Sequence, residues 1–264
     1  MSGAIACRVC GAETRPLFEK RVLGRHTANY HGCGSCGFVL TQEPDWLDEA
    51  YGEAISAVDT GVLARCLHQR RVLTVFLHLA GVGTAPCLDW AGGHGVLARL
   101  MRDVGFDFRW EDAYAQNLFA RGFEWTPGGR PPFAVTAFEV LEHLVRPVET
   151  LRKIAALGPR FLITSTQLYA GAAPDPAWRY LAPETGQHVA FYRRDTLETL
   201  AREAGFGEVR ATPALQLFSR GPVPSLAWRL ATLRGAPLYP LLRRLRPPLT
   251  EADSERLRAE RRAE

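Results

Sequence analysis

The sequence predicts an α/β protein: a mostly parallel sheet with helices on both faces, preceded by a small cysteine-rich module. Two observations carry this prediction. From residue 81 to about residue 215, short apolar runs alternate with segments of helical periodicity, which is the pattern of consecutive strand–helix–strand units. Before them, four of the six cysteines are gathered into two Cys-x-x-Cys pairs. The length of 264 residues suits one main domain with attachments.

The composition excludes several classes of protein. With 47% hydrophobic and 23% charged residues, the chain has the balance of a globular domain. Its net charge of +4 does not by itself indicate nucleic acid, and we expect no nucleic-acid partner. The first residues have no basic start and no long apolar run, and no stretch approaches the roughly 20 apolar residues of a membrane span. We therefore expect a cytoplasmic protein with reduced thiols, of undetermined oligomeric state.

Residues 1–40 are predicted to form a zinc ribbon. Cys7 and Cys10 make one tight knuckle, Cys33 and Cys36 make the second, and a glycine follows each pair. Four thiolates provide a closed tetrahedral Zn²⁺ site, which is structural because it leaves no open position for a substrate. A redox dithiol or a chance pairing is the alternative.

The flanking segments differ in character from the main domain, which we place at residues 81–220. Residues 41–80 are predicted to be a helical linker or lid, because apolar residues recur at helical spacing there. Residues 221–264 are predicted to be a basic helical extension, which the prolines at 237, 240, 247 and 248 break up and which ends in an exposed charged helix. This extension can be a helical cap on the core, a membrane-surface anchor or a partner-binding arm. The cap is the favoured interpretation.

A glycine-rich turn opens the main domain. Residues 87–98 read as a buried strand, a turn with three glycines and the start of a helix. Such a turn binds either NAD or S-adenosylmethionine, since glycine lets a ligand approach the backbone closely. Asp89, at the end of the strand, favours the second ligand. Its carboxylate would repel a pyrophosphate, whereas it suits an amino group and a sulfonium.

The second predicted strand, residues 106–112, ends in acidic residues. In nucleotide-binding α/β folds an acidic residue about 20 positions after the glycines holds the ribose hydroxyls. Asp112 lies 19 residues after Gly93, and Glu111 is the alternative, because alternation along a strand lets only one of them face the ligand. We expect a helix to begin at Tyr114 and Asn117, and a weakly marked third strand at residues 122–125.

The fourth predicted strand, residues 133–138, leads into the run Glu-Val-Leu-Glu-His at residues 139–143. Together with the glycine turn and the acid that follows the second strand, this run resembles the class I S-adenosylmethionine-dependent methyltransferases, with Ala91 where their first glycine usually stands. The resemblance implies a Rossmann-like sheet and S-adenosylmethionine as cofactor. The candidate cofactor-binding residues are Asp89, Ala91, Gly93, Gly95, Asp112, Phe138 and Glu139.

The remaining predicted elements are a helix at residues 146–157, a strand at 160–166, a helix at 195–205 and closing, antiparallel strands within 209–218. Before the last helix, the run Gln187–Tyr192 resembles a region of sugar C-methyltransferases, which also carry an N-terminal cysteine-ligated zinc module. That resemblance implies a nucleotide-linked sugar as acceptor and His188 as the base. Gln187 stands where that family usually has glutamate, and we expect no counterpart of the family's additional C-terminal domain. Tyr192 and His143 are the other catalytic candidates.

The sequence thus predicts a methyltransferase that acts on a small molecule. The accepting atom, whether carbon, nitrogen or oxygen, is left open. Two alternatives also remain open: an NAD-dependent enzyme that acts on a nucleotide sugar, and a non-catalytic binding module that keeps the methyltransferase fold.

Overall fold

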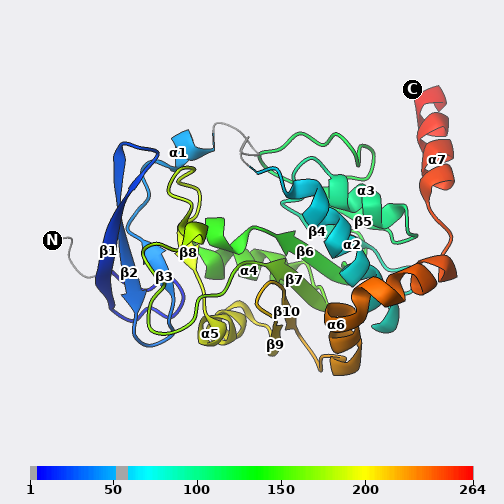
Figure 1. Cartoon of the computed structure of the whole chain (residues 1–264). Helices are drawn as coiled ribbons and strands as arrows, with labels where there is room; N and C mark the ends of the chain where they lie inside the picture. The colour runs from blue at the N-terminus through cyan, green and yellow to red at the C-terminus, as the bar shows by residue number, and fades with distance from the viewer. Residues whose placement is uncertain (1–4, 52–58, 264) are drawn as a thin grey trace. The chain divides into compact units, whose positions relative to one another are not determined.

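A computed structural model of the chain describes residues 5–51 and 59–263 (Figure 1). The chain divides into two compact units. The first unit comprises Met1–Ser56 and Ala137–Pro222, and the second comprises Ala57–Thr136 and Val223–Glu264.

The second unit carries the glycine turn. Helix α2 (Val62–Leu79) precedes strand β4 (Cys87–Trp90), and helix α3 (Val96–Arg102) connects β4 to strand β5 (Phe108–Glu111). Strand β4 pairs in parallel with β5 and with the start of strand β6 (Ala134–Phe138). Three of the four residues of β4 are buried, as expected of a strand inside a parallel sheet. The first, second and fourth predicted strands are therefore present.

Two expectations about the segment after β5 are wrong. No helix begins at Tyr114 or Asn117. The side chain of Asp112 accepts hydrogen bonds from the backbone N–H groups of Tyr114 and Ala115, and that of Asn117 accepts one from Ala120, so local side-chain bonds replace helical ones. The expected third strand is reduced to a single parallel bridge between Trp110 and Glu124.

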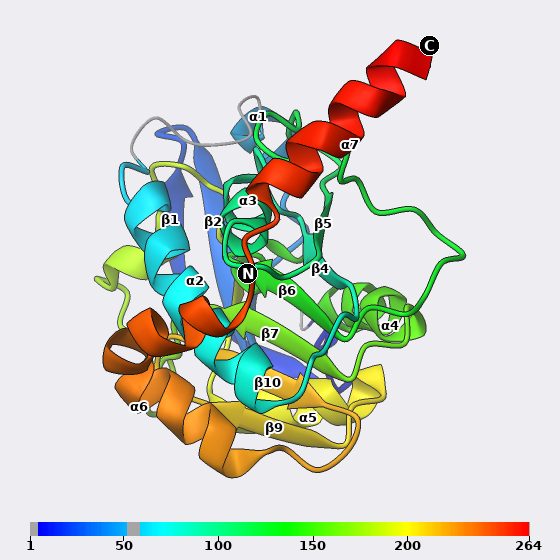
Figure 2. The same cartoon turned by 90° about the vertical axis from the view of Figure 1, so that its right-hand side faces the viewer.

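The C-terminal part of the second unit consists of helix α6 (Ser225–Leu242), the short 3₁₀ helix η3 (Arg243–Leu245) and helix α7 (Thr250–Ala263). Helix α6 lies alongside α2 (Figure 2). We expected prolines to break this region, but α6 continues through Pro237 and Pro240. Both prolines are on the exposed side of the helix, so the carbonyls that lose their N–H partners face water.

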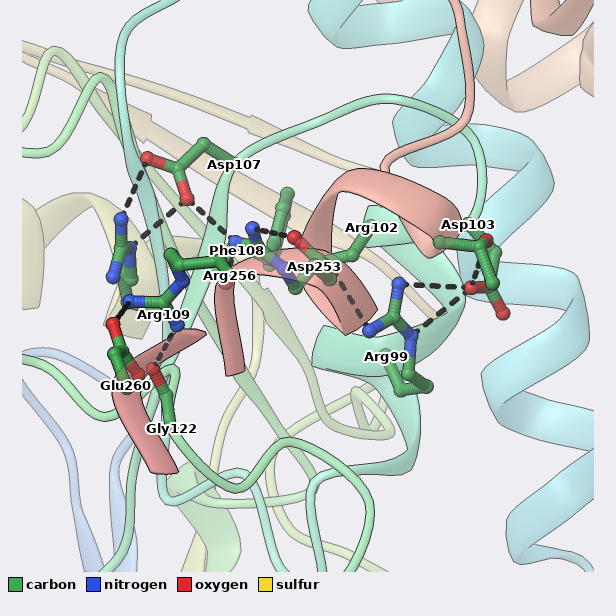
Figure 3. Close-up of polar contacts among 11 residues, drawn as sticks. Arg99, Arg102, Asp103, Asp107, Phe108, Arg109, Gly122, Asp253, Arg256 and Glu260 are labelled. Carbon is green, nitrogen blue, oxygen red and sulfur yellow. Dashed lines mark hydrogen bonds and ion pairs between the residues drawn. The ribbon is translucent and has the colours of Figure 1, made fainter. Parts of the chain in front are cut away.

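Helix α7 is mostly exposed, as predicted, but a buried ion pair at Asp253 anchors it (Figure 3). The Arg102 guanidinium donates two hydrogen bonds to the Asp253 carboxylate, at 2.8 and 2.7 Å. It also donates to Asp107 at 2.6 Å and to the carbonyl of Phe108 at 3.0 Å. Asp253 is only 5% exposed, because these donors replace the water that it loses.

The N-terminal part of the first unit is an antiparallel sheet in the order β1-β2-β3-β8 (Figure 1). It comprises β1 (Thr14–Val22), β2 (His26–Cys33), β3 (Val39–Thr41) and β8 (Ala190–Phe191). Helix α1 (Leu47–Ala50) follows β3 and begins the segment that was expected to be helical. The part of that segment at residues 52–58 lies outside the described residues.

The rest of the first unit follows the predicted order of elements. It comprises η1 (Leu141–His143), α4 (Pro147–Ala156), β7 (Phe161–Ser165), η2 (Arg179–Leu181), α5 (Arg194–Ala204), β9 (Glu208–Ala211) and β10 (Gln216–Ser219). Strand β10 pairs antiparallel with β7 and with β9, as predicted. Helix α5 begins one residue earlier than expected, since the hydroxyl of Thr196 accepts the N–H of Arg193 ahead of the first turn.

The mixed sheet confirms the predicted fold class. Its strand order is β5-β4-β6-β7-β10-β9, and β6 contributes residues to both units. Over residues 5–51 and 59–263, no helix has the length and apolar character needed to span a membrane.

Candidate functional site

The glycine turn of the second unit, residues 91–95, is held in a conformation that ordinary residues avoid. Ala91, Gly93 and Gly95 have φ angles of +54°, +55° and +84°. Glycine adopts such angles freely, while Ala91 does so at a cost in backbone energy. Any side chain on Gly95 would meet Asn117 and Ala120 at about 3 Å, so the turn requires glycine there for space as well.

Asp89 lies beneath this turn. Its side chain is 3% exposed and accepts a hydrogen bond of 2.7 Å from the hydroxyl of Thr136. Burial raises the pKa of Asp89 to about 7; the Thr136 hydrogen bond opposes that rise, and the charge of Asp112 adds to it. A cation bound nearby would restore the charged form, because it would offset the loss of hydration.

Asp112 fixes the turn from the end of the neighbouring strand. One carboxylate oxygen accepts the N–H of Gly93 at 2.8 Å, and the other accepts the two N–H groups that follow Asp112. The indole N–H of Trp110 donates to the carbonyl of Gly93 at 2.8 Å, so β5 holds both polar groups of that peptide. Asp112, the predicted ribose-binding residue, thus contacts Gly93 of the turn directly.

Three acids lie at the ends of β4 and β5: Asp89, Glu111 and Asp112. None of them forms an ion pair with a residue that the structure describes. Burial, followed by the charge of Asp112, also raises the pKa of Glu111. These three carboxylates fit a cationic ligand with hydroxyl groups, and they disfavour a pyrophosphate because its charge is negative. S-adenosylmethionine has both features, since it carries an ammonium, a sulfonium and a ribose.

The last two cofactor candidates, Phe138 and Glu139, belong to the first unit. Phe138 ends β6, and Glu139 follows with a φ of +53°. The N–H of Glu139 donates to the hydroxyl of Ser165 at 2.8 Å, and that hydroxyl donates back to the Glu139 carboxylate. Ser165 therefore holds Glu139 in its unusual conformation.

A cluster of titratable side chains in the first unit brings two catalytic candidates together. One ring nitrogen each of His143 and His188 and one carboxylate oxygen of Glu142 all lie within 4.8 Å of one another. The two imidazole rings meet edge to face, with their centroids 4.9 Å apart. His143 ends η1 and His188 precedes β8, so folding joins residues 45 positions apart.

Each histidine has one nitrogen fixed by a neighbour. Nδ1 of His188 lies 2.6 Å from the backbone carbonyl oxygen of Tyr180, and Nδ1 of His143 lies 3.1 Å from the hydroxyl of Tyr51. A carbonyl oxygen can only accept, so Nδ1 of His188 carries a hydrogen and Nε2 of the neutral ring is unprotonated.

Burial decides the charges in this cluster. It lowers the pKa of His143 to about 3, with a further electrostatic contribution from the neighbouring His188, so His143 is neutral near pH 7. Burial raises the pKa of Glu142, while its interaction with His188 and a hydrogen bond from the Tyr180 hydroxyl oppose the rise. The second carboxylate oxygen of Glu142 is buried and has no hydrogen-bond partner.

The third catalytic candidate, Tyr192, is fully buried. Its hydroxyl donates to the carbonyl of Leu141 at 2.7 Å, and burial raises its pKa well above 10. Tyr192 thereby ties the strand that follows His188 to η1, which carries His143.

The four cysteines of the predicted zinc site converge in the first unit. Their sulfur atoms lie within 4.8 Å of one another, with Cys7 to Cys36 at 3.6 Å and Cys10 to Cys33 at 3.5 Å. A tetrahedral zinc with bonds of about 2.3 Å would place its sulfur ligands about 3.8 Å apart, so the set fits the ion. The hydrogen bond between the two sulfur atoms lowers the pKa of Cys7 to about 5 and raises the pKa of Cys36.

Sequence reasoning left out three residues that support these sites: Thr136, Glu142 and Tyr180. The sequence placed Glu142 in the Glu-Val-Leu-Glu-His run, which was the only signal for it, but no role was assigned to it. Thr136 and Tyr180 gave none, because their contacts join distant parts of the chain.

Comparison with known proteins shows which family the chain belongs to. The family described as a methyltransferase domain matches residues 66–210. No curated protein matches the chain. Among solved structures, TnmH is 21% identical, with 68% of this chain and 62% of that chain covered and a TM-score of 0.41.

Two further structures are similar at the same level. Magnesium protoporphyrin IX methyltransferase from Synechocystis PCC 6803, with bound SAH, is 17% identical; 67% of this chain and 94% of that chain are covered, with a TM-score of 0.42. CalO1, a methyltransferase in calicheamicin biosynthesis, is 14% identical; 58% of this chain and 54% of that chain are covered, with a TM-score of 0.40. The chain thus spans less than two thirds of the length of TnmH and of CalO1.

Proposed function

The chain belongs to the methyltransferase-domain family, and on that premise we propose that it transfers the methyl group of S-adenosylmethionine to a small-molecule acceptor. The observation that carries the proposal is the set of unpaired acids around the glycine turn. When bound, the cofactor supplies an electrophilic methyl group, whose transfer to a nucleophile leaves the bonding electron pair on sulfur. The chain's own residues must then bind the cofactor and the acceptor, orient them for the transfer, and remove a proton from the acceptor.

We assign the cofactor cradle to Asp89, Ala91, Gly93, Gly95 and Asp112, all in the second unit. For Phe138 and Glu139, in the first unit, cofactor binding stays a prediction from the sequence. Asp112 follows β5 and accepts the N–H of Gly93, and it is the candidate partner of the ribose hydroxyls. Asp89 offers a buried negative charge to the cationic groups of the cofactor. The glycines allow a ligand to approach the backbone of the turn.

The proton is taken by His188 in this proposal. The carbonyl of Tyr180 fixes the proton on Nδ1, so Nε2 is the atom that accepts a proton from the acceptor. The buried carboxylate of Glu142 stabilises the imidazolium that forms, while His143 stays neutral and orients the ring. His188 and His143 are therefore the catalytic candidates, and Tyr192 holds the segment in place.

The acceptor is a small molecule in this proposal. Nucleotide-linked deoxysugars are the first class to assay, since the Gln187–Tyr192 run resembles that of sugar C-methyltransferases. Acceptors that present a phenol, an amine or an activated carbon should be included, because a neutral imidazole can deprotonate each kind of nucleophile when it is properly placed.

Transfer of a labelled methyl group from S-adenosylmethionine to this acceptor panel tests the proposal. With a productive acceptor, His188→Asn should lower turnover by roughly 10²–10⁴-fold and leave cofactor affinity unchanged. Normal turnover in His188→Asn would remove it from the mechanism. Binding of NAD without S-adenosylmethionine would favour the NAD-dependent alternative, and binding of neither would favour a non-catalytic module.

We also propose that the four cysteines hold one structural zinc. The two knuckles are built alike: the N–H of Gly11 donates to the carbonyl of Cys7, and the N–H of Gly37 donates to the carbonyl of Cys33. Repetition of this turn directs the four sulfur atoms to one point. Metal analysis of the purified chain should give about one zinc per chain, and a metal-free protein of full stability would contradict this assignment.

A further inference from the structure

The C-terminal helix α6 and the 3₁₀ helix η3 leave a large apolar surface uncovered. The buried side of α6 packs on α2, where the ring of Trp228 meets the ring of Phe76 edge to face at 5.7 Å. On the opposite side, Leu226 and Leu233 are 70% and 71% exposed. A helix that packs on a globular core needs an apolar face only on the side toward the core, so the exposed leucines of α6 require another explanation.

These residues belong to one stripe, which we call the leucine stripe. All of its members are exposed except Leu230, which is half-buried: Leu226, Leu230, Leu233, Pro237, Leu241 and Leu245. At 3.6 residues per turn, the five members on α6 fall within an arc of about 80°. The stripe continues onto η3, where Leu245 is 59% exposed. It is therefore a continuous apolar ridge and not a scatter of single residues.

Positive charge accompanies the stripe without any negative charge. Residues 221–250 contain five arginines and no lysine, aspartate or glutamate. Four of these arginines are exposed and have no acidic partner among the residues that the structure describes: Arg229, Arg234, Arg243 and Arg244. An apolar ridge flanked by unpaired arginines matches a surface that has an apolar interior and anionic phosphates.

A cavity of about 630 Å³ lies at the C-terminal end of the stripe. It is lined by Arg70, Asp103, Val104, Tyr239 and residues 243–248. Nε of Arg70 and the hydroxyl of Tyr239, which is 6% exposed, are buried and have no hydrogen-bond partner. The guanidinium of Arg70 lies over the ring of Tyr239 at 5.2 Å, and that of Arg243 lies 5.8 Å from the same ring.

These lining groups are the chemistry of a phosphate site. Asp103, the one acid in the lining, is already paired with Arg99 at 2.9 Å. Arg246 is occupied as well, because it donates to the carbonyls of Gly105 and Gly83. Arg70, Arg243 and Arg244 remain to meet an anion, and the Tyr239 hydroxyl can donate to it.

From the stripe and the cavity together, we propose that α6 and η3 dock on the surface of an anionic phospholipid membrane. The leucine stripe enters the boundary between headgroups and acyl chains, and the arginine-lined cavity receives a headgroup phosphate. This inference is independent of the proposed methyl transfer. It also assigns a function to the basic extension, for which a cap on the core was the favoured interpretation.

Co-sedimentation of the full chain with lipid vesicles tests the proposal. The chain should bind vesicles that contain phosphatidylglycerol and bind pure phosphatidylcholine vesicles much more weakly. Arg243→Gln and Arg244→Gln each remove one arginine, and each should weaken partitioning onto the vesicles about fivefold. Leu233→Ser should weaken it about tenfold. Because all three side chains are exposed, the folded state should persist.

Matched controls are available within the chain. Leu63→Ser removes a leucine on α2 that is 63% exposed but lies off the stripe, and Arg202→Gln removes an exposed arginine of the other unit. Neither should change vesicle binding. Equal losses in the controls and in the stripe variants would overturn the proposal.

Two further measurements distinguish the membrane from the other ligands that the cavity or the stripe could bind, which are a free phosphate and a second copy of the chain. If glycerol phosphate raises the melting temperature through Arg243 and Arg244 but vesicles are not bound, the cavity takes a free phosphate and the membrane proposal fails. If Leu233→Ser abolishes a concentration-dependent dimer seen by sedimentation while vesicles are not bound, the stripe joins two copies, and the proposal fails again. Absence of any vesicle binding refutes it directly.

Discussion

Protonation of Asp89 should control cofactor binding. Burial raises its pKa from 3.8 to about 7 in the free protein. If the cationic groups of S-adenosylmethionine lie near this carboxylate, the complex favours its charged form, so binding below pH 7 must expel a proton. Linkage then predicts that Kd rises about tenfold for each pH unit below about 7, until the pKa of the complex is reached.

Calorimetric titration with S-adenosylmethionine from about pH 8 to about pH 5 measures this slope directly. Repeating it in buffers of different ionisation enthalpy counts the released proton. Asp89→Asn keeps the shape of the side chain and should bind more weakly with no proton release from this position. S-adenosylhomocysteine, which lacks the sulfonium charge, should show a shallower slope. A Kd independent of pH, or a slope retained in Asp89→Asn, would refute the reasoning.

The same pKa fixes the sign of an effect on stability. Between pH 3.8 and about 7 the folded state binds one proton more at Asp89 than the unfolded state does. This contribution is fully present below pH 3.8 and is lost as the pH rises to about 7. A difference of about 3 pKa units corresponds to an effect on the order of 4 kcal/mol. Asp89→Asn should therefore flatten the decline in the free energy of unfolding over this window.

The remaining predictions concern the metal site and the C-terminal anchor. Cys33→Ser should release the zinc and destabilise the N-terminal sheet, measured by metal content and by thermal unfolding; retention of about one zinc per chain would contradict it. Asp253→Asn should lower the free energy of unfolding by about 2–3 kcal/mol, since Arg102 loses a buried partner but keeps Asp107. Glu260→Gln, at an exposed pair, is the matched control and should cost under about 1 kcal/mol in denaturant titrations.

Local patterns explain the parts of the fold that could be predicted. The strand at Cys87–Trp90, the turn with Gly93 and Gly95, and the helix after it depend on residues close together in sequence, and the structure has all three. The expected helix at Tyr114 failed because the side chain of Asp112 takes the N–H groups that a helix would use. A hydrogen-bonding alternative of this kind leaves no trace in apolar periodicity.

Contacts between distant residues explain most of what could not be predicted. Asp253 reads as one more charge on a polar helix, and only the fold reveals that Arg102 buries it. The same holds for Glu142, whose partner Tyr180 lies 38 positions later in the chain. Of the candidate site, the sequence indicated the glycine turn, the cysteines and the histidines. The groups that set their protonation became visible only in three dimensions.

Binding of S-adenosylmethionine to the full chain, with NAD titrated in parallel, tests the central claim most directly. The account predicts one S-adenosylmethionine per chain and no binding of NAD. It also predicts that Asp112→Ala weakens the binding of S-adenosylmethionine by about 1–3 kcal/mol, whereas Glu111→Ala has a smaller effect. Tight NAD binding without S-adenosylmethionine binding, or unchanged affinity in both variants, would contradict it.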